Sequence, residues 1–440
     1  MRNQHICYAM KFLYPFLPAF LFSVITAAQS PVPALPQQGQ ILIFGATAHL
    51  GNGNVIANSA IAFDKGKITL VADATTIRLD RSKFQKIYDA AGKHVYPGFI
   101  AANSQLGMIE IDAVRATNDK SETGAMNPNS RVIVAYNTDS EVTPTVRSNG
   151  ALLAQICPEG GVLSGSSSVV QLDAWNWEDA AIKMDEGQHL NWPQMRAPGG
   201  FGAGSPEQKP NEQYEKDIEQ IKMFFEEARA YAALEKVETI NPRFEAMKPL
   251  FSGSQTLYVH TNDAKTIRAA IQFSESFNLK TALVGGSDAW QEAAFLKSKN
   301  ITVVLERTQR LPSREDEDVD QPYKTAKMLF DAGVPFVFSI NEAWQQRNLA
   351  FQAGQAVGAG LPYEAAVAAL TLNTARLMGI DNNYGSLETG KSATLFISEG
   401  DALDMRTNQV TAAFIDGREI NLDNKQKYLN RKFTEKYRRN

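Results

Sequence analysis

Short apolar segments of strand length recur along most of the chain, and what lies between them changes with position. Near both ends the segments are separated by polar or turn-forming residues; they are residues 41–44, 60–63, 68–71, 393–397 and 410–415. Asp-Lys-Gly at 64–66 joins two of these segments and is typical of a β-hairpin turn. The pattern predicts mainly β-structure at the two ends of the chain.

In the middle of the chain, strand-like segments alternate with segments of helical character. The strand-like segments are residues 257–259, 281–284, 301–305 and 336–338. The segments between them, such as 263–277, have the length and apolar spacing of a helix. Regular alternation of this kind favours parallel βα units, and the commonest long arrangement of such units is an eight-stranded (β/α)8 barrel.

The first 28 residues differ from the rest of the chain. Two basic residues and no acidic one accompany an apolar run at 12–25, which ends in small residues just before Gln29. This pattern is typical of a secretory signal peptide; a membrane anchor is the alternative, but the run is short and interrupted by two prolines. We therefore expect residues 1–28 to be a signal peptide, whether translation starts at Met1 or Met10. The mature protein is then exported to the periplasm or the extracellular space.

Composition narrows the functions that the mature chain can have. The 440 residues include 44 Lys and Arg against 48 Asp and Glu, a net charge of −4. Without a basic excess, a nucleic-acid partner is not expected. Residues after 35 contain no uncharged apolar run long enough to cross a bilayer, so we expect no membrane span in the mature chain. Once the leader is removed Cys157 is the remaining cysteine, so no internal disulfide can form, and a small buried residue is its simplest role.

Three motifs connect the alternating middle of the chain with its β-rich ends. They are Tyr-Pro-Gly-Phe-Ile at 96–100, preceded by Ala-Gly-Lys at 91–93; Thr-Leu-Asn-Thr-Ala at 371–375, followed by Leu-Met-Gly at 377–379; and Gly-Ser-Leu-Glu-Thr-Gly-Lys at 385–391. In these motifs the chain resembles the amidohydrolase superfamily, and most of all its imidazolonepropionase-like branch, over about residues 40–420. The resemblance implies an α/β fold, with a distorted (β/α)8 TIM-like barrel over residues 98–380. It also implies a small composite β-sandwich built from both ends of the chain, residues 38–97 and 381–425.

The resemblance also indicates where metal ligands would lie. Family members carry His-x-His on the first barrel strand, where residues two apart point to the same side; here these positions are Asn103 and Gln105. A later family histidine is matched by His260, whereas the next one falls within residues 283–286, which contain no histidine. The family's aspartate, which serves as general base, is matched by Asn341. Of the ligands that can be aligned, His260 alone is kept.

The replacement residues are neutral amides, which are poor ligands for zinc, a metal that prefers imidazole, thiolate or carboxylate. Without a metal no water of pKa about 7 is generated, so the resemblance implies that metal-dependent hydrolysis is lost and that no cofactor is needed. The predicted ligand pocket consists of Asn103, Gln105, His260 and Asn341. Alternatively, these side chains only form hydrogen bonds with one another in a site that neither binds a ligand nor catalyses a reaction.

Two functions therefore stay open. In the first, the protein is a degenerate amidohydrolase that binds a peptide-like or cyclic-amide ligand, or pairs with an active relative in a homo- or hetero-oligomer. In the second, it is an active hydrolase of non-peptide or dipeptide C–N bonds, with a rearranged or single-metal site. His260 is then the candidate catalytic and metal-binding residue, and zinc is the expected cofactor.

Other residues that could take part in catalysis or ligand binding are better explained by structural roles. His189 is more typical of a packed histidine than of a metal ligand, and His49 is expected in an exposed loop. The glycines at 199–204 lack the Lys-Ser/Thr of a phosphate-binding loop, and the acidic run at 314–318 is expected above the barrel mouth. The serine-rich stretch at 161–168 has no Gly-x-Ser-x-Gly elbow, so a serine hydrolase is not favoured.

Overall fold

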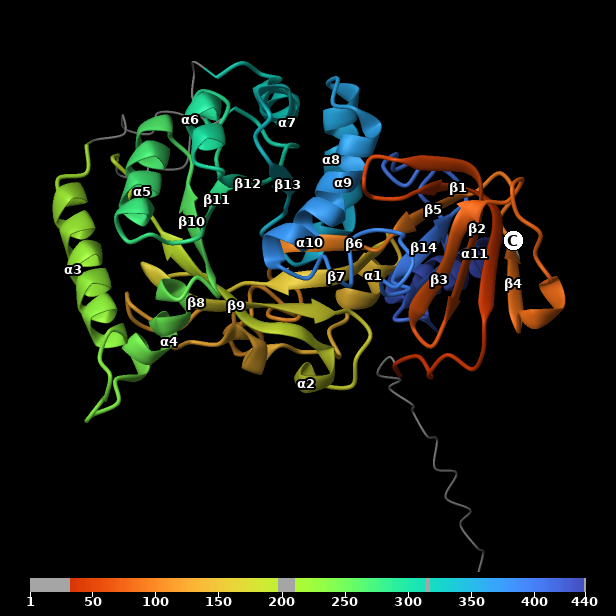
Figure 1. Cartoon of the computed structure of the whole chain (residues 1–440), viewed down its shortest axis with the longest axis horizontal. Coiled ribbons are helices and arrows are strands. Elements are labelled where there is room, and N and C mark those ends of the chain that lie inside the picture. The colour runs from red at the N-terminus through yellow and green to blue at the C-terminus, as the bar shows by residue number, and fades with distance from the viewer. Residues whose placement is uncertain (1–31, 197–209, 313–316, 439–440) are drawn as a thin grey trace, which may run out of the picture.

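The computed structural model describes residues 32–196, 210–312 and 317–438. Figure 1 shows two β-sheets: one curls into a barrel covered by helices, and the other is built from the two ends of the chain. Three of the features expected above lie wholly or partly outside the described residues: the signal peptide at 1–28, the glycine-rich loop at 199–204 and the acidic run at 314–318.

The barrel is an eight-stranded sheet. In spatial order its strands are β13 (Phe336–Phe338), β12 (Thr302–Leu305), β11 (Thr281–Gly285), β10 (Thr256–Thr261), β9 (Ala181–Asn191), β8 (Leu163–Gln171), β7 (Ala151–Ile156) and β6 (Phe99–Ser104). A parallel bridge between Ala102 of β6 and Ser339, just after β13, nearly closes the sheet on itself. The predicted barrel class is confirmed.

The barrel departs from strict strand–helix alternation at β8, which runs antiparallel to both β7 and β9. Antiparallel neighbours can be joined by short connections, whereas parallel ones need a long crossover. All nine residues of β8 are buried although its sequence is serine-rich. Its hydroxyls find partners on β9: Ser166 donates to Asp185 at 2.8 Å and Ser167 to Glu186 at 2.7 Å. The serine-rich stretch is therefore a structural strand.

Helices cover the outside of the barrel (Figure 1). They are α1 (Thr143–Arg147), α2 (Trp177–Ala180), α3 (Tyr214–Ala232), α4 (Pro242–Phe251), α5 (Ala264–Ser276), α6 (Ala293–Ser298), α7 (Gln321–Ala332), α8 (Leu349–Gly358), α9 (Tyr363–Leu370) and α10 (Leu372–Met378). The sequence of α3 shows why such segments form surface helices: Ile221, Phe225 and Ala228 share one buried side, and charged residues occupy the other. The helix α7 ends at Gly333, whose φ of 72° suits the left-handed position that closes a helix.

The second sheet, called the terminal sheet below, combines strands from the two ends of the chain. In spatial order these are β16 (Arg418–Glu419), β15 (Val410–Ile415), β14 (Leu395–Ser398), β5 (His94–Pro97), β1 (Ile41–His49), β2 (Val55–Asp64) and β3 (Lys67–Asp73), with β4 (Lys86–Asp89) also paired to β1. The two ends meet where Leu395 lies opposite Pro97 in an antiparallel pair. The expected hairpin turn is present, with positive φ at Lys65 and Gly66.

A cluster of ring side chains joins the terminal sheet to the barrel, and it includes His49, which the sequence led us to expect in an exposed loop. That expectation is wrong: His49 is 6 % exposed. Its Nδ1 lies 2.7 Å from Glu364 of α9 and its Nε2 lies 3.0 Å from Nδ1 of His94, while its ring stacks on Tyr96. A residue 315 positions away in sequence therefore covers this histidine.

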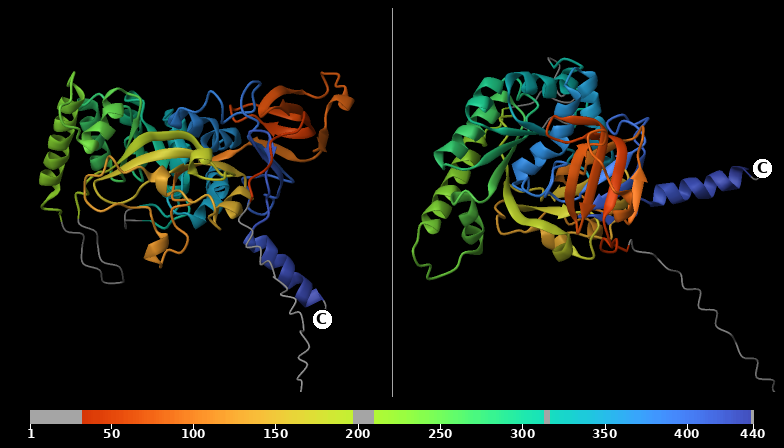
Figure 2. Two further views of the ribbon diagram at one scale, coloured as in Figure 1. Left: turned by 90° about the horizontal axis from the view of Figure 1, so that it is seen from below. Right: turned by 45° about the vertical axis from the view of Figure 1, so that its right-hand side comes forward.

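The last described helix, α11 (Lys425–Arg438), projects away from both sheets (Figure 2). None of its residues is buried. Within the described ranges, no helix is both long enough and apolar enough to cross a membrane.

Candidate functional site

The four side chains predicted to form a pocket lie near the carboxyl ends of three barrel strands. Asn103 is in β6 and Gln105 directly follows it, His260 is in β10, and Asn341 comes three residues after β13. All four line one cavity of about 240 Å³, together with Glu306 and other residues. The structure therefore brings the predicted residues together at the end of the barrel where active sites of this fold lie.

Asn103 has two unusual features. Its φ of 48° lies in the left-handed region, which asparagine tolerates better than most residues. Its backbone N–H donates to Oε1 of Gln155 at 3.0 Å, so the strand end is held by a neighbouring side chain. The side-chain Nδ2 is buried and finds no hydrogen-bond partner among the described residues. The wall of the cavity therefore contains an unpaired amide donor.

Gln105, in contrast, is occupied by its neighbours. Its Nε2 donates to Oε2 of Glu159 at 2.6 Å, and Lys120 pairs with the same carboxylate oxygen at 2.7 Å. The side chain of Gln105 is therefore held in place by an ion pair at the rim of the cavity.

His260 is paired with a second histidine from the adjacent strand. Nδ1 of His189 lies 2.8 Å from Nε2 of His260, and the His189 ring stacks on that of Tyr258. Burial lowers the pKa of His260 to about 4, and burial together with the nearby His260 lowers the pKa of His189 well below its ordinary value. Both rings are therefore neutral near pH 7, with one nitrogen donating and the other accepting.

A buried carboxylate lies behind the cavity wall. Glu186 of β9 accepts hydrogen bonds from the side chains of Gln155, Ser167 and Tyr258. Burial raises the pKa of Glu186, although the three donors act in the opposite direction. Since Gln155 also accepts from Asn103, this network connects the barrel interior to the cavity. Sequence reasoning missed Glu186 because its strand has no apolar alternation.

Glu306 is a second acid that sequence reasoning missed. It directly follows β12, so it occupies the same strand-end position that drew attention to His260 and Asn341. It lines both the cavity of about 240 Å³ and an adjoining one of about 340 Å³. Burial raises the pKa of Glu306, partly offset by Arg310. The signal that could have identified it is its place after the apolar segment 302–305.

The donors at this site do not fit the metal centre that the family resemblance implies. One imidazole and neutral amides stand at the ligand positions, and Nε2 of the imidazole already contacts His189. The position of a further histidine is Gly285, where a Cβ would approach Oδ1 of Asn262 to 2.6 Å. Within the described ranges, no three His, Cys, Asp or Glu residues are grouped so as to hold a metal ion. We therefore derive no reaction step through a metal.

The fold and the cavity define an α/β-barrel protein with a polar pocket at the strand ends. A model of the amidohydrolase family matches residues 202–420. This match identifies residues 202–420 as belonging to the amidohydrolase family, and the barrel has the same fold as solved amidohydrolase structures. No curated protein matches the chain.

Several solved structures share the fold. An amidohydrolase from Thermotoga maritima MSB8 has 21% identity and a TM-score of 0.73, covering 87% of this chain and 99% of its own. A Xaa-Pro dipeptidase with bound methionine has 14% identity and a TM-score of 0.54, with coverage of 86% and 99%. A molinate hydrolase has 14% identity and a TM-score of 0.53, with coverage of 88% and 96%. At these identities the likeness shows the common fold.

Proposed function

We propose that this protein is an exported, degenerate amidohydrolase that binds a peptide-like or cyclic-amide ligand without metal-dependent hydrolysis. One observation carries the proposal: the cavity at the strand ends is lined by amides and one neutral imidazole where the superfamily would place metal ligands. Such a surface recognises its ligand by hydrogen bonds, and it does not supply the activated water that hydrolysis needs.

The polar groups match those of an amide. The unpaired Nδ2 of Asn103 is a donor for a ligand carbonyl, and the carboxyl group of Glu306 can accept from a ligand N–H. The two adjoining cavities share Asn262, Glu306 and Asn341, so together they offer room for a ligand larger than one amino acid. A neighbour in fold is a dipeptidase with bound methionine, which supports a ligand of amino-acid chemistry.

The test is calorimetric titration of the purified protein with dipeptides and small cyclic amides, alongside metal analysis of the same sample. We expect binding without consumption of the ligand, and substoichiometric zinc. Asn103→Asp removes the amide donor but tolerates the same backbone conformation, and should weaken binding about tenfold. Asn300→Asp is the matched control, since Asn300 also has a positive φ but is exposed and remote from the cavity.

Hydrolysis of the ligand by protein that holds one metal ion per chain would contradict this proposal. If the protein binds no small amide, we expect it to be the inactive partner of an active relative. Size-exclusion chromatography of the two proteins together would then show a complex.

A second candidate function is an active hydrolase of C–N bonds around His260. Glu306 favours it, because an acid of raised pKa lines the same cavity as a neutral imidazole. In that case Glu306→Gln abolishes turnover while ligand binding persists. If no turnover is seen with dipeptides or other amides in the presence of added zinc, this candidate is excluded for those substrates.

A further inference from the structure

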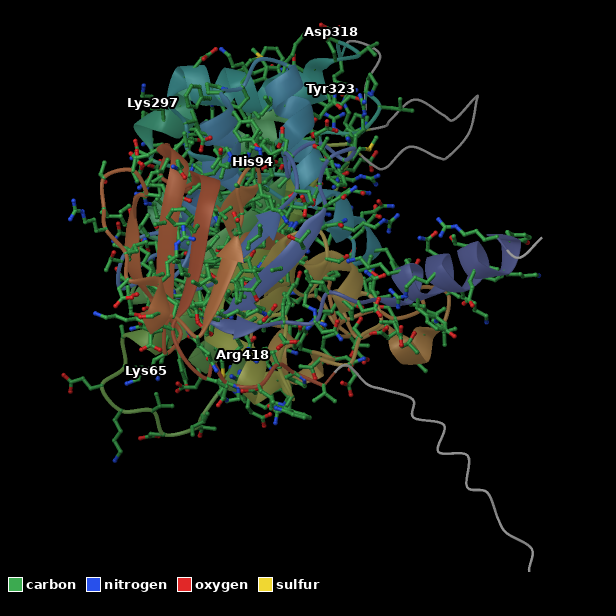
Figure 3. All side chains as sticks on the ribbon, turned by 90° about the vertical axis from the view of Figure 1, so that its right-hand side faces the viewer. Lys65, His94, Lys297, Asp318, Tyr323 and Arg418 are labelled. Carbon is green, nitrogen blue, oxygen red and sulfur yellow. The ribbon has the colours of Figure 1, made fainter. Side chains whose placement is uncertain are left out.

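Within the described residues, the side-chain hydrogen bonds from the α11 region to the barrel lie near the start of this helix. Oε1 of Gln426 accepts from the Thr145 hydroxyl at 2.7 Å, and Nδ2 of Asn424, just before the helix, donates to Ser148 at 3.0 Å. Beyond this attachment the helix extends into solvent with its side chains spread around it (Figures 2 and 3). A helix that buries none of its residues gains little stability from packing against the rest of the protein.

The charge of α11 is opposite to that of the rest of the chain. Its 14 residues include six cations and one acid, Glu435, for a net charge of +5. Because the whole chain carries −4, the residues outside α11 carry −9. The positive charge is therefore concentrated on one projecting element.

Two adjacent rows of side chains form a mixed face on this helix. At four-residue intervals, one row is Lys425, Leu429, Phe433 and Tyr437, and the other is Tyr428, Lys432 and Lys436. The apolar members are exposed, at 37 % for Leu429, 46 % for Phe433 and 68 % for Tyr437. We call these seven residues the aromatic–basic face.

Two lysines of this face are available, whereas two cations on the other side of the helix are held by nearby residues. Arg431 pairs with Asp423 at 2.6 Å, and Lys427 donates to the carbonyl of Leu422. Lys432 and Lys436 make no ion pair within the described residues, and their ammonium groups lie 5.9 and 5.4 Å from the ring centroids of Phe433 and Tyr437.

We propose that the aromatic–basic face binds the surface of an anionic phospholipid bilayer. Amphipathic helices with lysines beside aromatic and leucine side chains lie in the headgroup region, where the apolar groups enter the acyl boundary and the lysine stems extend to the phosphates. Lysine is depleted in the centres of protein–protein interfaces, so the same mixture is a poorer match for a protein partner. The inference is independent of the function proposed for the cavity.

The test is co-sedimentation of the purified mature protein with vesicles of phosphatidylcholine alone or with about one-third phosphatidylglycerol. We expect binding to the anionic vesicles, and loss of that binding as salt is raised. Lys432→Glu with Lys436→Glu should weaken it by at least about 30-fold, since each lysine near such a surface raises the affinity about fivefold. The charge-matched control is Lys236→Glu with Lys265→Glu, two exposed lysines on the body, which should bind as wild type.

A second variant separates charge from apolar contact. Phe433→Ser with Leu429→Ser leaves the charge of the helix unchanged and should also abolish sedimentation. Equal binding to neutral and anionic vesicles, or unchanged binding of the Lys432/Lys436 variant, would overturn the proposal. So would a dimer in lipid-free solution that Phe433→Glu converts to monomer, because the face would then be an interface between copies of the chain.

Discussion

Protonation of His260 is expected to destabilise the fold, because its ring is held neutral beside a second histidine. Burial lowers the pKa of His260 from 6.5 to about 4. The hydrogen bond between Nε2 of His260 and Nδ1 of His189 needs one donor and one acceptor, and two protonated rings would each present only donors. The pH dependence of stability should therefore reveal this pair.

The sign and size follow from the two pKa values. Above pH 6.5 the imidazole is neutral in both the folded and the unfolded protein, so it contributes no pH dependence. Between pH 6.5 and about 4 the unfolded chain binds a proton that the folded protein does not, and stability falls by about 1.4 kcal/mol per pH unit, or about 3 kcal/mol in all. This is a large part of the roughly 5–15 kcal/mol that stabilises an ordinary domain.

The assay is urea unfolding of the wild type and of His260→Gln at pH values from 7 down to about 4. Glutamine can still form a hydrogen bond with His189 but does not titrate. Carboxylates titrate in both proteins and cancel in the difference between their free energies of unfolding. We expect the wild type to lose about 3 kcal/mol relative to the variant across this range. Parallel pH profiles would refute the reasoning, because they would show that His260 accepts its proton as readily in the folded protein as in the unfolded one.

Three further predictions concern the metal, the terminal sheet and the leader. Asn103→His, Gln105→His and Asn341→Asp together should raise zinc affinity in a competition titration, although only modestly, since Gly285 leaves no room for another ligand; affinity equal to that of the wild type would mean that these positions do not converge as described. Truncation after residue 385 removes β14 and β15 and should give insoluble protein, whereas a soluble chain with a cooperative melt would show that the N-terminal strands fold alone. N-terminal sequencing of the exported protein should find a start close to Gln29, and an intact leader would contradict export by cleavage.

The parts of the fold that follow local rules could be predicted from the sequence. Apolar segments of strand length identified β10 to β13 because parallel strands in a barrel are buried on both faces. The convergence of Asn103, His260 and Asn341 also follows, since each lies at or just after a strand end and those ends meet at one rim. These predictions needed only the order of strands along the chain.

The remainder depended on contacts between distant residues. The antiparallel strand β8 was not predicted, because acceptors on β9 make its burial possible and few of its own residues are apolar. The local sequence around His49 predicts an exposed loop, because the residues that cover this histidine, Glu364, His94 and Tyr96, are distant in sequence. Glu186 could not be identified from the sequence either, because its strand has no apolar alternation and its three hydrogen-bond donors come from three other strands.

The unpaired group in the cavity determines which ligands the proposed function would favour. A buried donor without a partner, such as Nδ2 of Asn103, costs roughly 1–3 kcal/mol in the free protein. A ligand that places a carbonyl oxygen there recovers this cost, whereas an analogue without the carbonyl leaves the donor unpaired and also displaces any water near it. Sites of this kind reject analogues that lack the matching polar group more strongly than apolar pockets reject a missing methylene. Under the proposed function, the amides of this cavity would therefore select for an amide carbonyl, which is the same group that an active amidohydrolase attacks.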